Sequence, residues 1–471
     1  MAALNALARQ ASSSFGLPRR AAAALVLLLT ALAGCASVPD TTLLRARQAQ
    51  SERAADEGRK SYEQGGRIAS RLAPQAAQRD FLAHHLAVEA AVSDAPLVHG
   101  NQVRLLVDGR DAYAAMLQAI GQARRYIHME TYIFDDDEDG RRFVDALVAA
   151  RQRNVEVAVM VDAVGTLDTP QALFDRLREA GVQVTVFNPL NPAQARAGWS
   201  PNERNHRKVL VADAQVGYLG GMNISSVYSS GSRSDDDRPA RSAPWRDTHI
   251  EIRGPGVGEL ERILVDGWAS QGGPPLRRWI LPPAAPQGDL TLRVLANRPG
   301  EDDGYAVYLT LMSAFASARQ SIHITMAYFV PDPAFIEVLQ QAAQRGVDVT
   351  LVLPGFSDSS LVWHAGRSHY GPLLRAGVKI YERRDALLHA KTAVVDGVWS
   401  TVGSSNMDWR SFALNYEINA VILGAGFGRQ MEAQFARDVA SSVRVDPQAW
   451  EGRGVDDRFM ESFSRLFERW L

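Results

Sequence analysis

The residues best suited to chemistry in this 471-residue chain form a short pattern that occurs twice. In each copy a lysine follows a histidine by two residues, an aspartate follows that lysine by five, and an asparagine follows the aspartate by ten. The copies are His206, Lys208, Asp213 and Asn223, and His389, Lys391, Asp396 and Asn406. An imidazole can attack phosphorus or carry a proton, while an ammonium and an amide can bind phosphoryl oxygens. One copy is an incomplete phosphodiester site, but two copies facing each other are complete.

Each copy also predicts a β-strand that ends in a turn. The residues between lysine and aspartate are apolar and largely β-branched, which favours a strand. Side chains alternate along a strand, so histidine and lysine share one face and the aspartate lies on the other. We therefore expect Asp213 and Asp396 to be structural, accepting bonds from local backbone amides. A solvated basic pair is the alternative for a single copy, but matching offsets in two copies disfavour it.

This pattern, HxK(x)4D followed by G-[GS]-x-N, resembles the phospholipase D superfamily. Four flanking segments narrow the resemblance to its bacterial cardiolipin synthase branch. They are Met129–Phe134, Arg204–Lys208, Trp245–His249 and Asn415–Asn419. The resemblance extends from about residue 102 to residue 440 and leaves out the first hundred residues. It implies an α/β fold with two tandem phospholipase D-like domains, each a mixed sheet flanked by helices, packed face to face around one shared active site.

The resemblance also assigns roles within the site. It makes His206 the nucleophile, forming a phosphohistidine, and His389 the general acid and base. It places an acid downstream of each motif to hold its imidazole, which suggests Asp247 for His206 and Glu417 for His389. Ser404 is a further candidate donor to the phosphate. The predicted catalytic set is His206, Lys208, Asp213, Asn223, Asp247, His389, Lys391, Asp396, Ser404, Asn406 and Glu417.

The function implied is transfer of a phosphatidyl group from a donor phospholipid to phosphatidylglycerol, giving cardiolipin. The donor, phosphatidylglycerol or phosphatidylethanolamine, stays open. Two other classes remain: a phospholipase D or nuclease that uses water as acceptor, and a lipid-binding lipoprotein with a relic site. A formal net charge of -2 disfavours a nucleic-acid partner. The sequence predicts neither a cofactor nor a metal, and the acidic run Asp135–Asp139 is better explained as a loop than as a calcium site.

Strands and helices alternate along residues 103–187, and the pattern recurs in the second half, which indicates a duplicated α/β unit. We predict a first domain at 99–271, a linker at 272–287 and a second domain at 288–445. Residues 35–98 are expected to form a helical stalk or a cover on the first domain. Residues 446–471 are expected to form one amphipathic helix, whose apolar stripe either packs in the core or lies on a bilayer surface.

The N-terminus predicts export. Basic residues precede a short apolar run, Ala21–Leu32, which leads into Leu-Ala-Gly-Cys35. This resembles a lipobox, so residues 1–34 are a predicted signal peptide and Cys35 a predicted lipidation site. An ordinary signal peptide or a short anchor with an incidental cysteine is the alternative. We expect a membrane-anchored lipoprotein of the bacterial cell envelope that faces the periplasm, and Ala36 slightly favours the outer membrane.

Three other residues lie on strands expected at corresponding places in the two halves of the repeat. Glu130, on the expected strand that also carries His128, is a candidate for lining the site. His128 and His323 recur in the two halves, but their apolar strands are typical of core histidines whose hydrogen bonds are satisfied.

Overall fold

The computed structural model describes residues 57–93, 95–191, 199–229, 245–276, 284–299 and 305–468. The predicted signal peptide, Cys35 and residues 469–471 of the C-terminal segment lie outside these ranges. Within them, no helix is both long enough and apolar enough to cross a membrane.

The first half alternates strands and helices as predicted. Among the elements of this half, one strand fills the interval between Lys208 and Asp213 of the first motif, and His206 and Lys208 lie just before it. In chain order the elements are β1 (Val98–Val107), α6 (Asp108–Gln122), β2 (Tyr126–Thr131), α7 (Glu138–Gln152), β3 (Glu156–Asp162), α8 (Gln171–Glu179), β4 (Gln183–Phe187), β6 (Val209–Ala212), β7 (Val216–Gly220), β9 (Thr248–Arg253) and α9 (Val257–Ser270).

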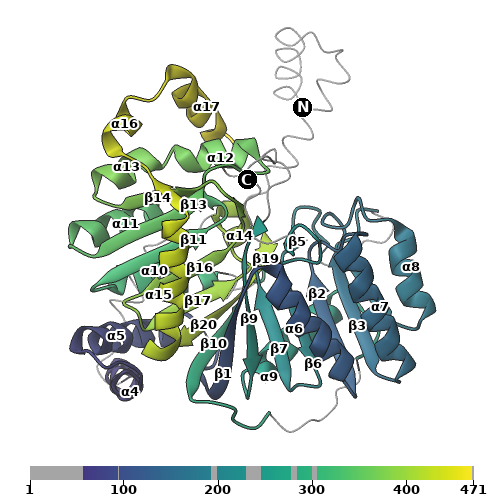
Figure 1. Cartoon of the computed structure of the whole chain (residues 1–471). Helices are drawn as coiled ribbons and strands as arrows, with labels where there is room; N and C mark the ends of the chain where they lie inside the picture. The colour runs from purple at the N-terminus through teal and green to yellow at the C-terminus, as the bar shows by residue number, and fades with distance from the viewer. Residues whose placement is uncertain are drawn as a thin grey trace, which may run out of the picture. The chain divides into compact units, whose positions relative to one another are not determined.

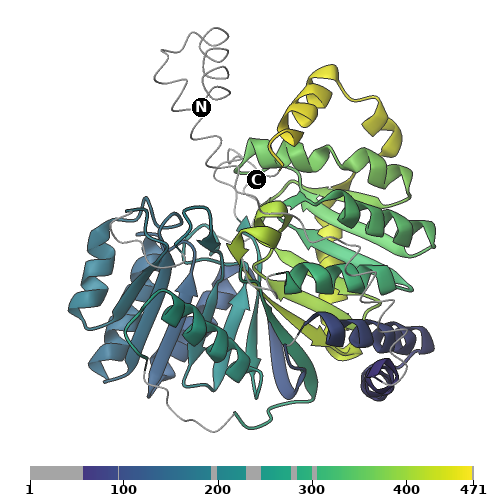
Figure 2. The same ribbon diagram turned by 180° about the vertical axis from the view of Figure 1, so that it is seen from behind.

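The second half repeats this order with two additional helices, one of which is the short α14 (Trp409–Ala413) between β17 and β20. Its elements are β10 (Leu290–Ala296), α10 (Ala306–Ser317), β11 (Ser321–Met326), α11 (Pro333–Gln344), β13 (Asp348–Pro354), α12 (Ser360–Arg367), α13 (Tyr370–Arg375), β14 (Lys379–Arg383), β16 (Lys391–Val395), β17 (Trp399–Gly403), β20 (Ile418–Leu423) and α15 (Ala425–Ala440). Helices cover both faces of each half, as the two opposite views show (Figures 1 and 2).

The two halves share one mixed sheet of fifteen strands, in the order β21-β14-β13-β11-β16-β17-β20-β10-β1-β9-β7-β6-β2-β3-β4, in which the edge strand β21 is Ser442–Arg444. They join edge to edge, because β1 pairs antiparallel with β10, with Val98 opposite Leu292. Their faces also meet, since one buried apolar cluster includes Leu219 and Ile250 of the first half with Val402 and Ala420 of the second. The predicted face-to-face packing is confirmed, and the continuous sheet is an addition that the sequence did not indicate.

Each motif aspartate fastens its strand to the neighbouring one. Asp213 and Asp396 have left-handed backbones, with φ of 55° and 52°. The carboxylate of Asp213 accepts bonds from the backbone amides of residues 124, 125 and 126 at 2.8–2.9 Å, and Asp396 does the same for residues 319–321. The role is structural, but the expected partners were wrong: the amides lie at the start of β2 and β11, not in the aspartates' own turns.

The N-terminal helix α5 (Ala76–Val92) packs on the second half, and α4 (Glu57–Leu72) packs on α5. Gln78 Nε2 donates to the carbonyl of Asp396 at 2.9 Å, and His85 Nδ1 lies 3.0 Å from Ser313 Oγ on α10. The prediction of a stalk or a cover on the first domain was therefore wrong for these residues. An amphipathic pattern shows which helix face is buried, but not which surface buries it.

The C-terminal segment forms two helices where one was predicted. They are α16 (Pro447–Glu451) and α17 (Val455–Arg465), separated by a stretch that contains Gly452 and Gly454. The α17 stripe is not in the core, because Phe459 is 65% exposed and Leu466, just after the helix, is 74% exposed. The helix packs on α12 instead, as Figure 1 shows.

Candidate active site

Two very short strand pairs bring the motifs of the two halves together. Just before His206, β5 (Arg204–Asn205) pairs with β19 (Asn415–Tyr416) of the second half. Just before His389, β15 (Leu387–Leu388) pairs with β8 (Trp245–Arg246) of the first half. The backbone amides of the two histidines extend these pairs, donating to the carbonyls of Tyr416 and Arg246 at 2.9 and 2.8 Å. Each histidine is therefore held by the opposite half.

This exchange decides which acid holds which histidine. Glu417 directly follows β19, and its carboxylate lies 3.0 Å from His206 Nδ1. Asp247 directly follows β8, and its carboxylate lies 2.7 Å from His389 Nδ1. The predicted assignment of Asp247 to His206 and Glu417 to His389 was wrong, because each short strand pairs across the halves. In both pairs a proton on Nδ1 leaves the Nε2 lone pair available for phosphorus or for a proton.

Both histidines line one cavity of about 250 Å³. Asn223 and Asn406 line it too, together with aromatic rings from both halves. The ring of Tyr132 lies 5.2 Å from that of His206, and the ring of Trp245 lies 5.1 Å from that of His389. The cavity therefore brings together the histidines and asparagines of both motifs, and its wall combines aromatic rings with polar and charged side chains.

The two lysines are buried beside the histidines. Lys208 and Lys391 are 2% and 1% exposed, and each ammonium donates to the carbonyl oxygen of its own motif histidine. Burial lowers the pKa of Lys391 to about 8, although Asp247 and Glu417 oppose the shift. Burial and the charge of Lys391 also hold the pKa of Lys208 well below its usual range. Two cations this close are suited to an anion placed between them.

The same surroundings keep both imidazoles neutral. Burial lowers the pKa of His206 to about 4, partly offset by Glu417. Burial, Lys391 and Lys208 together hold the pKa of His389 well below its usual range. A neutral imidazole with Nδ1–H bonded to a carboxylate is the form that can act as a nucleophile or a base.

Gly221 and Ser404 each lie two residues before a motif asparagine, and they differ because the acid behind each histidine contacts them differently. A Cβ at Gly221 would lie 2.3 Å from Asp247 Oδ1, so the Asp247 carboxylate occupies the place of a side chain. At the matching position, the Ser404 hydroxyl donates to Glu417 at 2.5 Å. Ser404 was predicted to donate to the phosphate, and this was wrong: its hydroxyl supports the acid behind His206.

The two asparagines also differ in their contacts. Asn223 Oδ1 accepts from the backbone amide of Ile133 at 3.1 Å, and its Nδ2 donates to the Tyr228 hydroxyl at 2.9 Å. Asn406 Oδ1 is buried and has no hydrogen-bond partner among the described residues. Each amide still has an N–H for a phosphoryl oxygen.

The other residues that the sequence singled out, Glu130, His128, His323 and the acidic run Asp135–Asp139, do not line the cavity. Glu130 does not line it; it is buried near Arg207 and lies 3.5 Å from the amide nitrogen of Asn205. His128 and His323 pair with Glu261 and Glu432, at 2.8 and 2.6 Å. Within the acidic run, Asp137 caps α7 by accepting from the Gly140 amide. Nowhere in the described part of the chain do three or more His, Cys, Asp or Glu side chains gather as a possible metal site.

Sequence reasoning missed several residues that line the cavity. They are Tyr132, Arg204, Tyr228, Tyr328, Asp358, Asp408, Arg410, Ser411 and Asn415. Tyr132 is the first residue after β2 and Tyr328 is the second after β11, so the repeat aligns Tyr132 with Ala327, and comparing the halves would not have found them. Arg204 belongs to one of the flanking segments that carry the family resemblance, but the resemblance assigns it no role.

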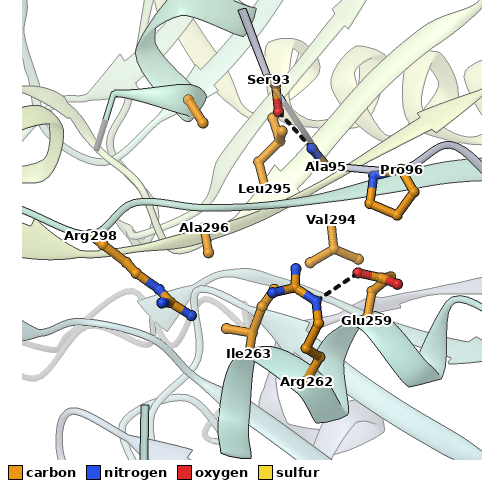
Figure 3. A pocket seen from close by; sticks show the side chains of 11 residues that line it. Ser93, Ala95, Pro96, Glu259, Arg262, Ile263, Val294, Leu295, Ala296 and Arg298 are labelled. Atoms are coloured by element: carbon orange, nitrogen blue, oxygen red, sulfur yellow. Dashed lines mark hydrogen bonds and ion pairs between the residues drawn. The ribbon is translucent and has the colours of Figure 1, made fainter. Parts of the chain in front are cut away.

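A larger cavity of about 350 Å³ lies between α9 and β10, away from the motifs (Figure 3). Its labelled polar groups are already engaged, with Arg262 donating to Glu259 at 3.1 Å and the Ala95 amide to Ser93 Oγ at 3.2 Å. The described side chains that line it include neither motif histidine nor motif lysine, so it offers no comparable chemistry.

The duplicated fold and the shared two-histidine cavity define a phospholipase D-like protein. A structure of phosphatidylserine synthase from Haemophilus influenzae shares this fold, with a TM-score of 0.62 at 14% identity, over 81% of this chain and 99% of that chain. The family model described as cardiolipin synthase, PLD-like domain, matches residues 116–232 and 311–439. A cardiolipin synthase of Alkalihalophilus pseudofirmus is 34% identical over 79% of this chain and 72% of its own length, and cardiolipin synthase A of Pseudomonas aeruginosa is 36% identical over 75% and 70%. The chain belongs to the cardiolipin synthase family.

Proposed function

We infer that this chain is a cardiolipin synthase, which transfers a phosphatidyl group from a donor phospholipid to a hydroxyl of phosphatidylglycerol. The observation that carries this function is the pair of carboxylate-held histidines in one cavity. The family membership supports transfer as the reaction. Two groups at opposite sides of one phosphorus atom are what a two-step displacement needs.

The first step forms the intermediate. His206 Nε2 attacks phosphorus, the bond from phosphorus to the donor headgroup oxygen breaks, and His389 gives that oxygen a proton. Burial and the charges of Lys391 and Lys208 hold the pKa of His389 down, and a bound phosphodiester anion offsets those charges, so His389 takes up from solvent the proton that it then donates. Lys208, Lys391 and the two asparagine amides stabilise the charge on the phosphoryl oxygens.

The second step releases the product. His389 removes the proton from the acceptor hydroxyl, whose oxygen attacks phosphorus while the bond to His206 breaks. With phosphatidylglycerol as acceptor the product is cardiolipin, and with water it is phosphatidic acid. The aromatic rings beside the two histidines support the first outcome, because they disfavour water next to the intermediate.

Defined lipid vesicles test this proposal. Purified enzyme is given phosphatidylglycerol alone, or phosphatidylglycerol mixed with isotopically labelled phosphatidylethanolamine, and lipids are separated by thin-layer chromatography. We expect cardiolipin in both cases, and the label shows which donor is used. His206→Ala serves as the inactive control. Phosphatidic acid as the sole product would contradict a synthase and favour the hydrolase alternative.

We further propose that the protein works at a membrane as an envelope lipoprotein. The exposed apolar stripe of α17 supports membrane contact, because Phe459, Phe463 and Leu466 are 65%, 43% and 74% exposed. The helix packs on α12, whose Val362 lines the active-site cavity. This arrangement fits a bilayer beside the cavity entrance.

Two measurements address these membrane proposals separately. Labelled palmitate should enter the wild-type chain and not Cys35→Ala, while no labelling of either would contradict lipidation. For α17, a Phe459→Ser/Leu466→Ser double variant of the chain lacking residues 1–35 should sediment with anionic vesicles less than its parent does. Equal sedimentation of the two would contradict docking through α17.

A further inference from the structure

The wall of the active-site cavity contains two arginines whose counterparts in the repeat are uncharged. Arg204 and Arg410 both line the cavity. Arg204 precedes His206 by two residues and Arg410 follows Asn406 by four. At the same distances from His389 and Asn223 stand Leu387 and Val227. The two halves have therefore diverged at these positions: one of each pair is a cation in the wall of the active site, and the other is an apolar residue.

The two guanidinium groups are fixed close to each other. Arg410 donates through both terminal nitrogens to Asn202, at 3.3 Å to the side-chain oxygen and 3.1 Å to the carbonyl. Arg204 is 2% exposed, and its Nε has no hydrogen-bond partner among the described residues. Burial lowers the pKa of Arg204, and the charge of Arg410 lowers it further. Two arginines held in mutual repulsion, one with an unused buried N–H, are typical of an anion-binding site.

The charges already present do not account for Arg410. Asp162 lies 3.6 Å from Arg204 and balances it. No carboxylate lies within ion-pair distance of Arg410 in the described ranges. Asp408 is near, but it caps α14 (Trp409–Ala413) through the Ser411 amide, and burial raises its pKa to about 7. Asp358 also lines the cavity, but its carboxylate accepts from the Tyr328 hydroxyl at 2.7 Å and makes no ion pair with Arg410. Among the described residues, Arg410 is therefore a cation in the cavity wall that no carboxylate pairs with directly.

We propose that Arg410, supported by Arg204, forms a second phosphate subsite that binds the phosphodiester of the acceptor phospholipid. This inference rests on the proposed function. In phosphatidylglycerol the attacking hydroxyl and the phosphate are joined by a short glycerol arm. Holding the phosphate at Arg410 restricts where the hydroxyl can go, which favours its attack over that of water or another neutral alcohol. The subsite thus biases the shared intermediate towards lipid acceptors.

A competition between two acceptors tests the subsite. Enzyme acts on phosphatidylglycerol vesicles in the presence of a fixed concentration of ethanol. Cardiolipin then reports the anionic acceptor, and phosphatidylethanol reports a neutral acceptor that uses the same intermediate. For Arg410→Gln we expect the ratio of cardiolipin to phosphatidylethanol to fall at least about tenfold, as expected when a charge-assisted bond is lost. Because both products come from the same active molecules, the ratio does not depend on the fraction that folds.

Two further variants complete the test. Arg410→Lys keeps a cation and should recover part of the ratio, while Val227→Gln, at the matching position of the other half, should leave it at the wild-type value. An unchanged ratio in Arg410→Gln would overturn the subsite, whether both products fall or neither does. A wild-type enzyme that forms phosphatidylethanol but no cardiolipin would instead overturn the proposed synthase function, so the two failures are distinguishable.

Discussion

The two halves of the active site carry the same motif but hold their histidines with unequal acids. Glu417, behind His206, receives bonds from the Ser404 hydroxyl and from His206 itself. These partners and Lys208 hold its pKa below the usual range although burial acts in the opposite direction. Asp247, behind His389, has Gly221 where the other half has serine, and burial raises its pKa to about 6.

This difference matches the two roles that the reaction requires. A nucleophilic histidine benefits from an acid that stays ionised throughout, because the carboxylate stabilises the positive charge that develops on the ring as it bonds to phosphorus. A histidine that gives and takes protons benefits from a partner whose pKa is nearer to neutrality. Duplication therefore supplied two equivalent half-sites, and small changes around the acids made them unequal.

The largest effect should come from either histidine. His206→Ala and His389→Ala should each lower cardiolipin formation by about 10⁴-fold or more, because members of one catalytic unit fail together. Initial rates on phosphatidylglycerol vesicles measure this. The double variant should be no worse than either single variant. Loss in only one of the two single variants would show that the halves do not share one reaction.

The acids should differ in the same assay. Glu417→Gln should lower the rate by about 10³- to 10⁴-fold, in line with the loss of a histidine-orienting carboxylate. Asp247→Asn should cost about tenfold less, because the native carboxyl is more readily protonated. The two acids are unequal if the rate falls further in Glu417→Gln than in Asp247→Asn. A larger loss for Asp247→Asn would reverse the assignment of nucleophile and proton carrier.

Substitutions at Gly221 and Ser404, which contact the two acids, should have smaller effects on the rate, and the two substitutions should change the pH dependence differently. Gly221→Ala should lower the rate by about a hundredfold, because a Cβ there meets Asp247 at 2.3 Å and moves a histidine-supporting group. Ser404→Ala should cost about tenfold, since it removes one bond to Glu417 without a clash. The pH dependence separates them: only Ser404→Ala should raise the pKa of Glu417. Equal effects of both substitutions on rate and pH profile would contradict the two arrangements.

The smallest effect concerns pH. Below about pH 6 Asp247 gains a proton and loses the charge that supports His389, and above about pH 8 Lys391 loses its proton and the charge that it offers to phosphate. We expect kcat/KM to be bell-shaped, with limbs near these values. Lys391→Arg keeps its charge at high pH, so its alkaline limb should move upward, at a cost of about tenfold in rate. An alkaline limb that stays in place would exclude Lys391 as its source.

The sequence predicted the parts of the site that periodicity and duplication determine. Matching offsets identified both His/Lys/Asn sets, and strand alternation separated Asp213 and Asp396 from the reactive face. The pairing of the acids could not be predicted in this way. It depends on two-residue strands, β5 and β8, whose partners in the other half are chosen by tertiary packing and not by local pattern.

Other surprises have the same origin. The joining of β1 to β10 and the packing of α5 on the second half both depend on which apolar surfaces meet, which an amphipathic pattern leaves open. Arg410 lies outside the motif, and its proposed role depends on residues that are near it in space but distant in the sequence. By contrast, the pattern G-[GS]-x-N already contains glycine in one copy, Gly221, and serine in the other, Ser404, and the structure supplies the reason for this difference.

The most direct test of the account is to trap the covalent intermediate. A phosphatidyl donor with a p-nitrophenol leaving group needs no proton from His389, so His389→Ala should release a burst of one nitrophenol per chain and then stop. Acid quenching, digestion and mass spectrometry should locate one phosphatidyl group on His206. A second group per chain, a group on His389 of the His206→Ala variant, or no burst at all would contradict a single shared site in which His206 is the nucleophile.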